Sequence, residues 1–297
     1  MKKQLPKIIV ILGPTSTGKS DLAVYLAKKF KGEVISADSR QVYKGMNIGS
    51  GKITKKEMMG VPHYLLDIVD PKKVYNVEKF QRDGAKAIQD ILNHEKLPII
   101  CGGTGFYIDA LVFDERFPDV PPNKKLRKML EKKSLRALMK EISKLDPDRA
   151  KVLDPYNKVR IIRAIEIART LGKVPRVKRT KHYETLFVGL TLDRAKLRER
   201  IHTRLLKRIK AGMFREILNL HKRGVSWKRL YDFGLEYRYV SLYLQKKLTK
   251  EEMLIKLENE ICQFAKRQMQ WFKRNQKIKW FAPGENVKIV KKIKRFI

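Results

Sequence analysis

The 297-residue sequence has only two cysteines, Cys101 and Cys262, and they lie far apart along the chain. A disulfide framework and a cysteine-rich zinc site are therefore excluded, and a reducing compartment such as the cytoplasm is expected. No run approaches the roughly 18 apolar residues that a membrane span requires, and the first apolar run is short and ends in a Gly-Pro turn. We therefore expect neither a membrane span nor a cleaved leader.

Acidic residues are scarce relative to basic ones. Lys and Arg number 68 against 31 Asp and Glu, which gives a formal net charge of +37. Residues 185–297 alone contain 29 basic and 10 acidic side chains. A generally lysine-rich proteome explains part of such an excess, but its uneven distribution favours a polyanionic partner such as a nucleic acid.

The N-terminal part alternates predicted strands and helices. Short apolar runs predict strands, and apolar residues at helical spacing predict helices. The alternation is typical of a parallel sheet with right-handed crossovers. The expected strands are 7–12, 33–37, 64–69 and 97–101, and the expected helices are 20–30 and 77–94.

A phosphate-binding motif lies between the first predicted strand and helix. Residues 13–20, GPTSTGKS, fit G-x-x-x-x-G-K-[ST]. Backbone N–H groups of such a loop point at phosphate oxygens, Lys19 neutralises their charge, and the Ser20 hydroxyl can ligate Mg²⁺. The motif indicates a di- or triphosphate, most commonly that of ATP, but not what is attached to it. The predicted pyrophosphate-binding residues are Gly13, Pro14, Thr15, Ser16, Thr17, Gly18, Lys19 and Ser20.

The pattern changes after the fourth predicted strand. From Asp119 to about residue 182 it is helical and highly charged, and strands return at 185–192 and 278–281 with a long helical tract between them. We therefore predict an α/β fold with a P-loop NTPase-like parallel sheet core, formed by residues 1–118 and 183–297. An all-helical insertion is predicted at 119–182.

Two polar residues follow predicted strands at the edge where open parallel sheets bind ligands. Asp38 follows the second strand and Thr104 the fourth, so both are expected near the phosphate loop. Each also has a structural alternative. Asp38 is suited to cap a helix or to support Mg²⁺ indirectly, and Thr104 is suited to cap a helix that starts at Gly105.

Beyond the phosphate loop, five segments resemble the tRNA dimethylallyltransferase family over nearly the whole chain. They are DSRQVYKGMNIG (38–49), GGTGFYI (102–108), LDPDRAKVLDPYNKVRIIRAIE (145–166), RLLKRIKAGM (204–213) and FAKRQMQWFKR (264–274). Two positions depart from the pattern: Glu236 stands where the family often has Gly, and Val159 where Gln is common.

The resemblance implies a function and its partners. Members of this family move a dimethylallyl group from its pyrophosphate onto N6 of the adenosine just 3′ to the anticodon, position 37 of tRNA. The expected partners are dimethylallyl pyrophosphate and the tRNA anticodon stem-loop, the expected cofactor is Mg²⁺ with Ser20 as ligand, and the expected state is a cytoplasmic monomer. The implied catalytic residues are Asp38 as general base, Thr104, Arg204 and Lys19.

The predicted tRNA contacts combine the resemblance with charge and aromatic patterning. On the C-terminal helix, basic residues recur at seven-residue spacing with Trp271 and Phe272 between them, which suits backbone tracking and base stacking, although both aromatic residues fit a core equally well. The predicted tRNA-binding residues are Asp38, Ser39, Arg40, Gln41, Thr104, Arg127, Val159, Arg160, Ile161, Ile162, Arg163, Lys266, Arg267, Lys273 and Arg274.

Two other readings remain open at this point. A small-molecule or nucleotide kinase uses the same phosphate loop, but it does not need the basic excess and needs lid arginines within the insertion. A non-catalytic RNA-binding protein does not explain Lys19, Ser20, Asp38 and Thr104 together. Arg204 lies with Arg200 and Arg208 at helical spacing, a stripe that without the resemblance reads as a solvated helix face.

Overall fold

The computed structural model describes residues 5–115, 117–176 and 179–297. The chain forms two compact units, one of residues 1–114 and 181–297 and the other of residues 115–180. The predicted helical insertion, 119–182, corresponds to the second unit with its boundaries shifted by a few residues.

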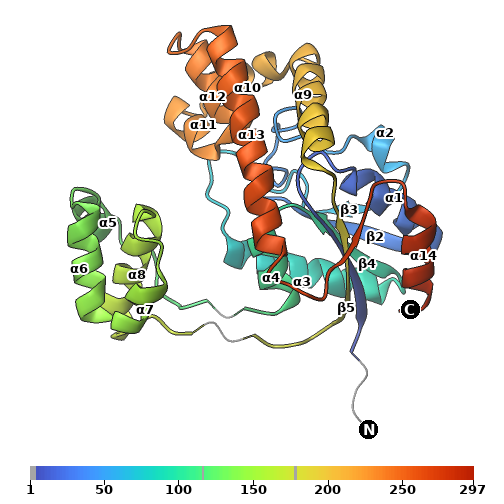
Figure 1. The fold of residues 1–297 in the computed structure, drawn as a ribbon, viewed down its shortest axis with the longest axis horizontal. Coiled ribbons are helices and arrows are strands. Elements are labelled where there is room, and N and C mark those ends of the chain that lie inside the picture. The colour runs from blue at the N-terminus through green and yellow to red at the C-terminus, as the bar shows by residue number, and fades with distance from the viewer. Residues whose placement is uncertain (1–4, 116, 177–178) are drawn as a thin grey trace. The chain divides into compact units, whose positions relative to one another are not determined.

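Six parallel strands form the sheet of the larger unit, in the order β3-β2-β4-β1-β5-β6 (Figure 1). Within β1, Ile8, Val10 and Leu12 join one core cluster and Ile9 and Ile11 the other, because successive side chains of a strand point to opposite faces. The strands are β1 (Lys7–Leu12), β2 (Gly32–Ala37), β3 (His63–Tyr64), β4 (Leu97–Gly102), β5 (Glu184–Leu190) and β6 (Lys279–Phe281).

The predicted strand at 64–69 is wrong beyond Tyr64. Leu65 and Asp67 have φ angles of 62° and 55°, left-handed values that an extended strand does not contain. Val69 makes only an isolated bridge, with Tyr43. The apolar spacing in this segment reflects the burial of Leu65 and not an extended backbone.

Helices of the larger unit cover both faces of the sheet (Figure 1). Leu22 and Leu26 from α1 and Ile289 and Ile293 from α14 pack on one face. The other face is covered by α3, α4 and α9 to α13. The helices are α1 (Lys19–Phe30), α2 (Lys55–Met58), α3 (Val77–Asn93), α4 (Gly105–Val112), α9 (Arg194–Lys210), α10 (Met213–Lys222), α11 (Trp227–Phe233), α12 (Leu235–Leu244), α13 (Lys250–Phe272) and α14 (Asn286–Lys294).

The insertion is a bundle of four helices with its own apolar core. They are α5 (Lys124–Glu131), α6 (Leu135–Leu145), α7 (Pro147–Val152) and α8 (Lys158–Leu171). Each begins after a residue whose side chain accepts a hydrogen bond from the first turn: Asn123, Ser134, Asp146 and Asn157. Across the described ranges of both units, no helix is long and apolar enough to cross a membrane.

Candidate active site

The loop between β1 and α1 has the geometry that its sequence predicts. Gly13 has a φ of 141°, and a Cβ there would overlap the carbonyl group of Leu190. Gly18 has a φ of 86° and precedes α1 without a side-chain cap. The N–H groups at the start of α1 therefore face the loop, as a bound phosphate requires.

Lys19 is held within this loop. Its Nζ donates to the carbonyl oxygen of Pro14 at 2.7 Å. Burial lowers the pKa of Lys19 to about 8, with the nearby charge of Arg204 acting in the same direction. An anionic group in the loop would replace the lost hydration of the ammonium group and favour its charged form.

Asp38 and Thr104 meet at the carboxyl ends of β2 and β4. Thr104 Oγ1 accepts from the N–H of Ser39 at 3.2 Å, and Thr104 makes no side-chain cap of α4. Asp38 Oδ1 accepts from the N–H groups of Arg40 at 2.8 Å and Gln41 at 3.3 Å. Asp38 therefore caps a turn rather than a helix, and the two predicted catalytic residues lie on neighbouring, hydrogen-bonded segments.

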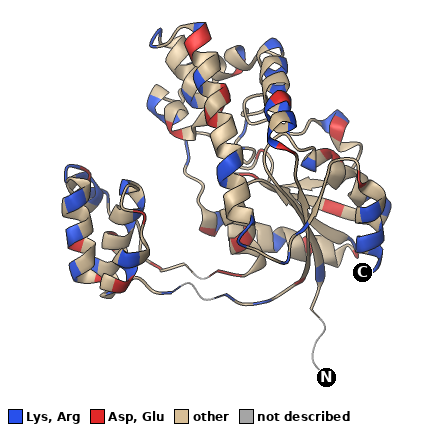
Figure 2. Ribbon diagram, viewed as in Figure 1, with Lys and Arg blue, Asp and Glu red and all other residues tan. Residues whose placement is uncertain are grey.

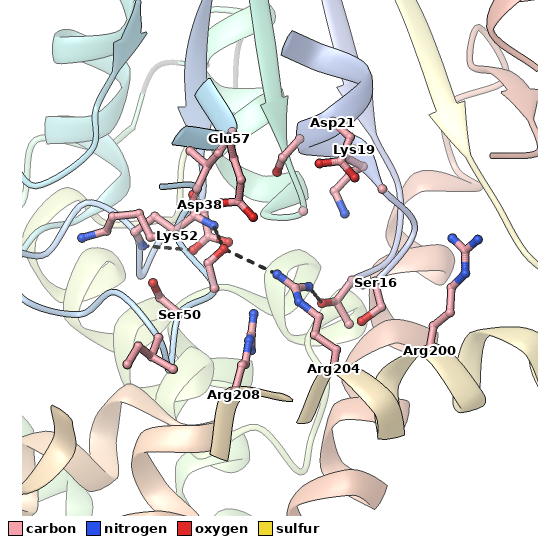
Figure 3. Close-up of a pocket in the computed structure, with 18 of the residues that line it drawn as sticks. Ser16, Lys19, Asp21, Asp38, Ser50, Lys52, Glu57, Arg200, Arg204 and Arg208 are labelled. Carbon is pink, nitrogen blue, oxygen red and sulfur yellow. Dashed lines mark hydrogen bonds between the residues drawn. The ribbon is translucent and has the colours of Figure 1, made fainter. Parts of the chain in front are cut away.

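Arg204 faces the phosphate loop from α9 (Figure 3). Its guanidinium donates to Thr15 Oγ1 at 3.2 Å and to the Gly51 carbonyl at 3.5 Å. Burial, and then the charge of Arg208, lower the pKa of Arg204 to about 10. Gly51 has a φ of 62°, and a Cβ there would overlap both guanidinium groups. The reading of this stripe as a solvated helix face is therefore wrong for Arg204 and Arg208.

Three polar residues that the sequence analysis did not assign to the site hold it together, and Glu236 among them was noted only as a departure from the family pattern. Glu236 accepts from Arg208 at 2.7 Å. Glu216 accepts from three successive N–H groups, those of residues 47–49. Gln268 on α13 accepts from the Thr15 N–H at 2.9 Å and donates to the Gly103 carbonyl at 2.8 Å. Gln268 stands within FAKRQMQWFKR, where the flanking basic residues drew attention to charge rather than to this amide.

These elements surround a cavity of about 900 Å³ (Figure 3). The phosphate loop and α9 contribute cationic side chains to it, and Asp38 contributes a carboxylate from the end of β2. Ile48, Ile53 and Phe264 add apolar surface. The cavity is therefore suited to a substrate with an anionic end, an apolar part and a proton to lose.

Other predicted tRNA contacts in the larger unit are partly engaged within the protein. Arg40 Nε donates to the Phe233 carbonyl at 2.7 Å, and burial lowers the pKa of Arg40. Gln41 donates to the Gly51 carbonyl. Lys266 and Lys273 are exposed, whereas Arg267 pairs with Glu260 and Arg274 stacks on Trp271. Lys273 caps α13, which ends one residue before it.

Among the predicted tRNA contacts of the insertion, too, some residues are engaged within the protein and others are exposed. Ile161 and Ile162 lie in its apolar core, so their prediction as tRNA-binding side chains is corrected. Arg127 and Arg163 bind the buried carboxylate of Glu166. Burial opposes the ionisation of Glu166, but hydrogen bonds led by that of Arg127 lower its pKa to about 2. Of this group, Val159 and Arg160 are exposed.

The side chains around the cavity fit a magnesium ion only if substrate phosphates supply some of its ligands. Among the described residues there is no group of three or more His, Cys, Asp and Glu side chains that could hold a metal. Ser20 is exposed at the first turn of α1 and lines the cavity with Asp21 and Asp38. One hydroxyl, phosphate oxygens and waters form a set that Mg²⁺ accepts. Ser20 as a metal ligand stays a prediction.

The chain matches known sequences over most of its length. A model of the family described as IPP transferase matches residues 41–275. A protein named tRNA dimethylallyltransferase 2, from Treponema denticola, is 46% identical over 275 residues, which are 91% of this chain and 92% of that protein. One named tRNA dimethylallyltransferase 1, from Syntrophus aciditrophicus, is 42% identical and covers 91% and 90%.

Solved structures share the fold. The tRNA isopentenylpyrophosphate transferase of Bacillus halodurans matches with a TM-score of 0.75 and 34% identity, over 97% of this chain and 96% of that chain. A eukaryotic dimethylallyltransferase whose structures show it acting on tRNA matches with a TM-score of 0.81 and 29% identity, over 94% and 74%. The similarity therefore extends over nearly the whole of this chain.

Proposed function

The chain belongs to the IPP transferase family, and we propose that it transfers a dimethylallyl group from dimethylallyl pyrophosphate to N6 of adenosine 37 in tRNA. The observation that carries the proposal is the position of Asp38, which lines one cavity together with the phosphate loop, Lys19 and Arg204. Thr104 lies beside it, because its hydroxyl accepts from the N–H of Ser39. Asp38 is then placed to accept the proton of the attacking amine, and the phosphate loop is placed to bind the leaving pyrophosphate.

In the proposed reaction, the bond between N6 and C1 of the allyl group forms while the bond between C1 and the pyrophosphate oxygen breaks. The exocyclic amine is a poor nucleophile because its lone pair is delocalised into the adenine ring. Asp38 takes the N6 proton, which raises the nucleophilicity of the nitrogen. The Thr104 hydroxyl is proposed to donate to the bridging oxygen, where negative charge develops as the bond breaks.

The leaving pyrophosphate is proposed to be held by the loop amides, Lys19 and Arg204. These groups are already fixed by hydrogen bonds to Pro14 and Thr15, so little reorganisation is needed when charge develops. Mg²⁺, held by Ser20 and the phosphates, would supply further charge neutralisation. Every residue in this scheme comes from one chain, so the proposed reaction needs no second subunit, which supports a monomer. The proposed substrate, tRNA, supports action in the cytoplasm.

A kinase remains the strongest rival, and the distribution of charge disfavours it. Residues 185–297 carry 29 basic and 10 acidic side chains, an excess that suits tRNA and that phosphate transfer to a small molecule does not need. Within the insertion, Arg127 and Arg163 are in addition bound to Glu166 and so are not free to act on a nucleotide.

The test is incubation of tRNA with the protein, dimethylallyl pyrophosphate and Mg²⁺, followed by nuclease digestion and mass spectrometry of the nucleosides. We expect N6-dimethylallyladenosine at position 37, none from tRNA with another base there, and none with ATP in place of the allyl donor. Lys19→Ala should abolish transfer and leave tRNA affinity nearly intact. Phosphorylation of an added acceptor by ATP, with no transfer to tRNA, would contradict the proposal.

A further inference from the structure

Three planar groups form a partly exposed surface next to the catalytic edge of the sheet. Phe106 lies on the first turn of α4, two residues after Thr104, and is 40% exposed. Its ring contacts that of Trp271 edge-on, with centroids 6.1 Å apart. The guanidinium of Arg274 lies 3.8 Å from the centre of the Trp271 ring. Phe106, Trp271 and Arg274 are called the aromatic platform below.

The platform is fixed to the site by α13. Trp271 Nε1 donates to Asp109 Oδ2 at 3.0 Å, and the indole leaves no room for a Cβ on Gly105. One turn earlier on the same helix, Gln268 donates to the Gly103 carbonyl. The segment that carries Thr104 and the platform residue Phe106 is therefore held against α13 at both ends.

The platform is not simply the edge of the apolar core. Phe272 is buried in the core and Trp271 packs against it, whereas Phe106 extends this aromatic group to the exposed surface. Single exposed apolar side chains are common on protein surfaces, but here an exposed ring, an indole and a guanidinium lie in contact. Lys273 and Arg274 also make this end of α13 basic, which suits a polyanion.

We propose that the aromatic platform stacks the nucleobase adjacent to the adenosine that is modified. The inference rests on the proposed function, because delivery of N6 to Asp38 requires the adenosine to leave its base stack. Its neighbour then loses a stacking partner, and aromatic rings and guanidinium planes replace such a partner in single-stranded RNA recognition. Stacking of this kind contributes roughly 5- to 150-fold in affinity per base.

The experiment uses anticodon stem-loop RNA with 2-aminopurine on the 5′ or the 3′ side of the target adenosine, titrated with the full chain in the absence of allyl donor. We expect quenching of the reporter on one side when the wild type binds. Phe106→Leu should weaken affinity roughly 5- to 150-fold and reduce the quenching, whereas Phe106→Tyr should preserve both. Arg274→Lys should reduce the quenching while leaving the salt dependence of binding unchanged, because the charge is retained.

Tyr25 offers a matched control, since it is 38% exposed and lies on α1, on the opposite face of the sheet. Tyr25→Leu should leave affinity and quenching unchanged. Wild-type affinity and quenching in Phe106→Leu, or no quenching on either side in the wild type, would overturn the platform. Transfer to tRNA by the wild type is measured separately. If the wild type transfers the group normally but Phe106→Leu changes neither affinity nor quenching, the platform alone is refuted. If the wild type quenches the reporter but transfers nothing to tRNA, the proposed reaction is refuted.

Discussion

The two oxygens of the Asp38 carboxylate have different surroundings. Oδ1 accepts two backbone N–H groups, while Oδ2 accepts none from the described part of the chain. An asparagine keeps an acceptor for the two N–H groups and loses only its basicity. We therefore expect Asp38→Asn to slow the chemical step by roughly 10²–10⁴, the usual contribution of a positioned general base, with tRNA affinity unchanged. Single-turnover transfer at saturating substrates measures that step.

Two results would remove Asp38 from this part in the reaction. If Asp38 only caps its turn, the rate of the asparagine variant should equal that of the wild type. If Asp38 supports the metal indirectly, a large excess of Mg²⁺ should restore the rate.

In the proposed reaction, we expect Lys19 to make the rate sensitive to pH. Its pKa of about 8 means that the free protein loses this positive charge as pH rises through about 8, whereas an ordinary lysine stays charged to about 10.5. We expect kcat/KM for dimethylallyl pyrophosphate to fall above pH 8, since that parameter reports the free protein. Lys19→Arg should be less active and lack this fall. A wild-type profile flat to pH 10 would contradict the assignment.

The same pKa predicts a stability effect of the opposite direction. Between about pH 8 and 10.5 the unfolded chain binds a proton at Lys19 that the folded chain has released. The free energy of unfolding should therefore rise with pH in this window, because the cost of burying the charge disappears. Urea unfolding of the wild type relative to Lys19→Met isolates the contribution, and added pyrophosphate should diminish it by favouring the charged lysine.

Site residues were predictable from the sequence where the chemistry of a motif requires particular residue types. The glycines and lysine of the phosphate loop are examples, because few other residues meet its geometry. Glu216 and Glu236 were not predictable as site residues, because a lone glutamate on a helix carries no local signal. Their contacts with residues 47–49 and Arg208 arise only when α9, α10 and α12 pack together.

At the level of elements, α13 joins two strand-to-helix loops through one amide. Gln268→Ala would leave the Thr15 N–H and the Gly103 carbonyl without their partner in a partly buried setting. Buried polar groups that lose a partner cost about 1–3 kcal/mol, so the free energy of unfolding should fall by that amount. Gln270→Ala, at an exposed position of the same helix, should change it by less than about 0.5 kcal/mol. Urea denaturation compares the two, and equal stabilities would show that the amide link is unimportant.

The ion pair between α9 and α12 permits a second test at this scale. Arg208 and Glu236 are only 14% and 10% exposed at their side chains. Removing one partner of a buried pair leaves a charge uncompensated and costs about 3–5 kcal/mol, which we expect for Glu236→Ala. By contrast, the side chains of Lys228 and Asp232 on α11 are 85% and 48% exposed, so Asp232→Ala should cost less than about 1 kcal/mol. A small cost for Glu236→Ala would mean that Arg208 finds another partner.

The elements themselves were largely predictable, and the exception is informative. Long apolar or helically spaced runs gave β1, β4 and α3 nearly at their observed bounds. The strand prediction for 64–69 failed because Leu65 adopts a left-handed conformation that its residue type rarely takes, and because the apolar pattern outweighed the turn signal of Asp67, a type that tolerates this conformation. Backbone conformation there is set by packing against the rest of the fold.

At the scale of the whole molecule, the basic excess was predictable but the residues available to RNA were not. Figure 2 shows Lys and Arg positions, coloured blue, along α9 and α13 of the larger unit and along the helices of the insertion. Composition cannot distinguish an exposed basic side chain, which is free to contact RNA, from one that a buried carboxylate of the protein already binds. Arg160 is exposed, whereas Arg127 and Arg163 are bound to Glu166.

This distinction predicts how salt affects tRNA binding. Each phosphate neutralised by Lys or Arg releases counterions, so six to ten contacts should lower affinity by roughly 10³–10⁵ between 50 and 200 mM salt. Arg160→Glu should reduce the slope of log affinity against log salt by about 1 and leave stability unchanged, because we expect its exposed side chain to contact a phosphate and not the rest of the protein. Lys266→Glu and Lys273→Glu should act in the same way, with affinity for dimethylallyl pyrophosphate unaltered.

Arg127→Glu should behave differently, because it puts a second carboxylate beside the buried Glu166. We expect it to destabilise the insertion by about 3–5 kcal/mol, the cost of breaking a buried ion pair, and to weaken tRNA binding through loss of structure. Filter binding across a salt series, with thermal unfolding of each variant, separates the two effects. A flat salt response in the wild type would contradict the electrostatic account, and a stable Arg127→Glu with a reduced slope would move Arg127 to the RNA-contacting group.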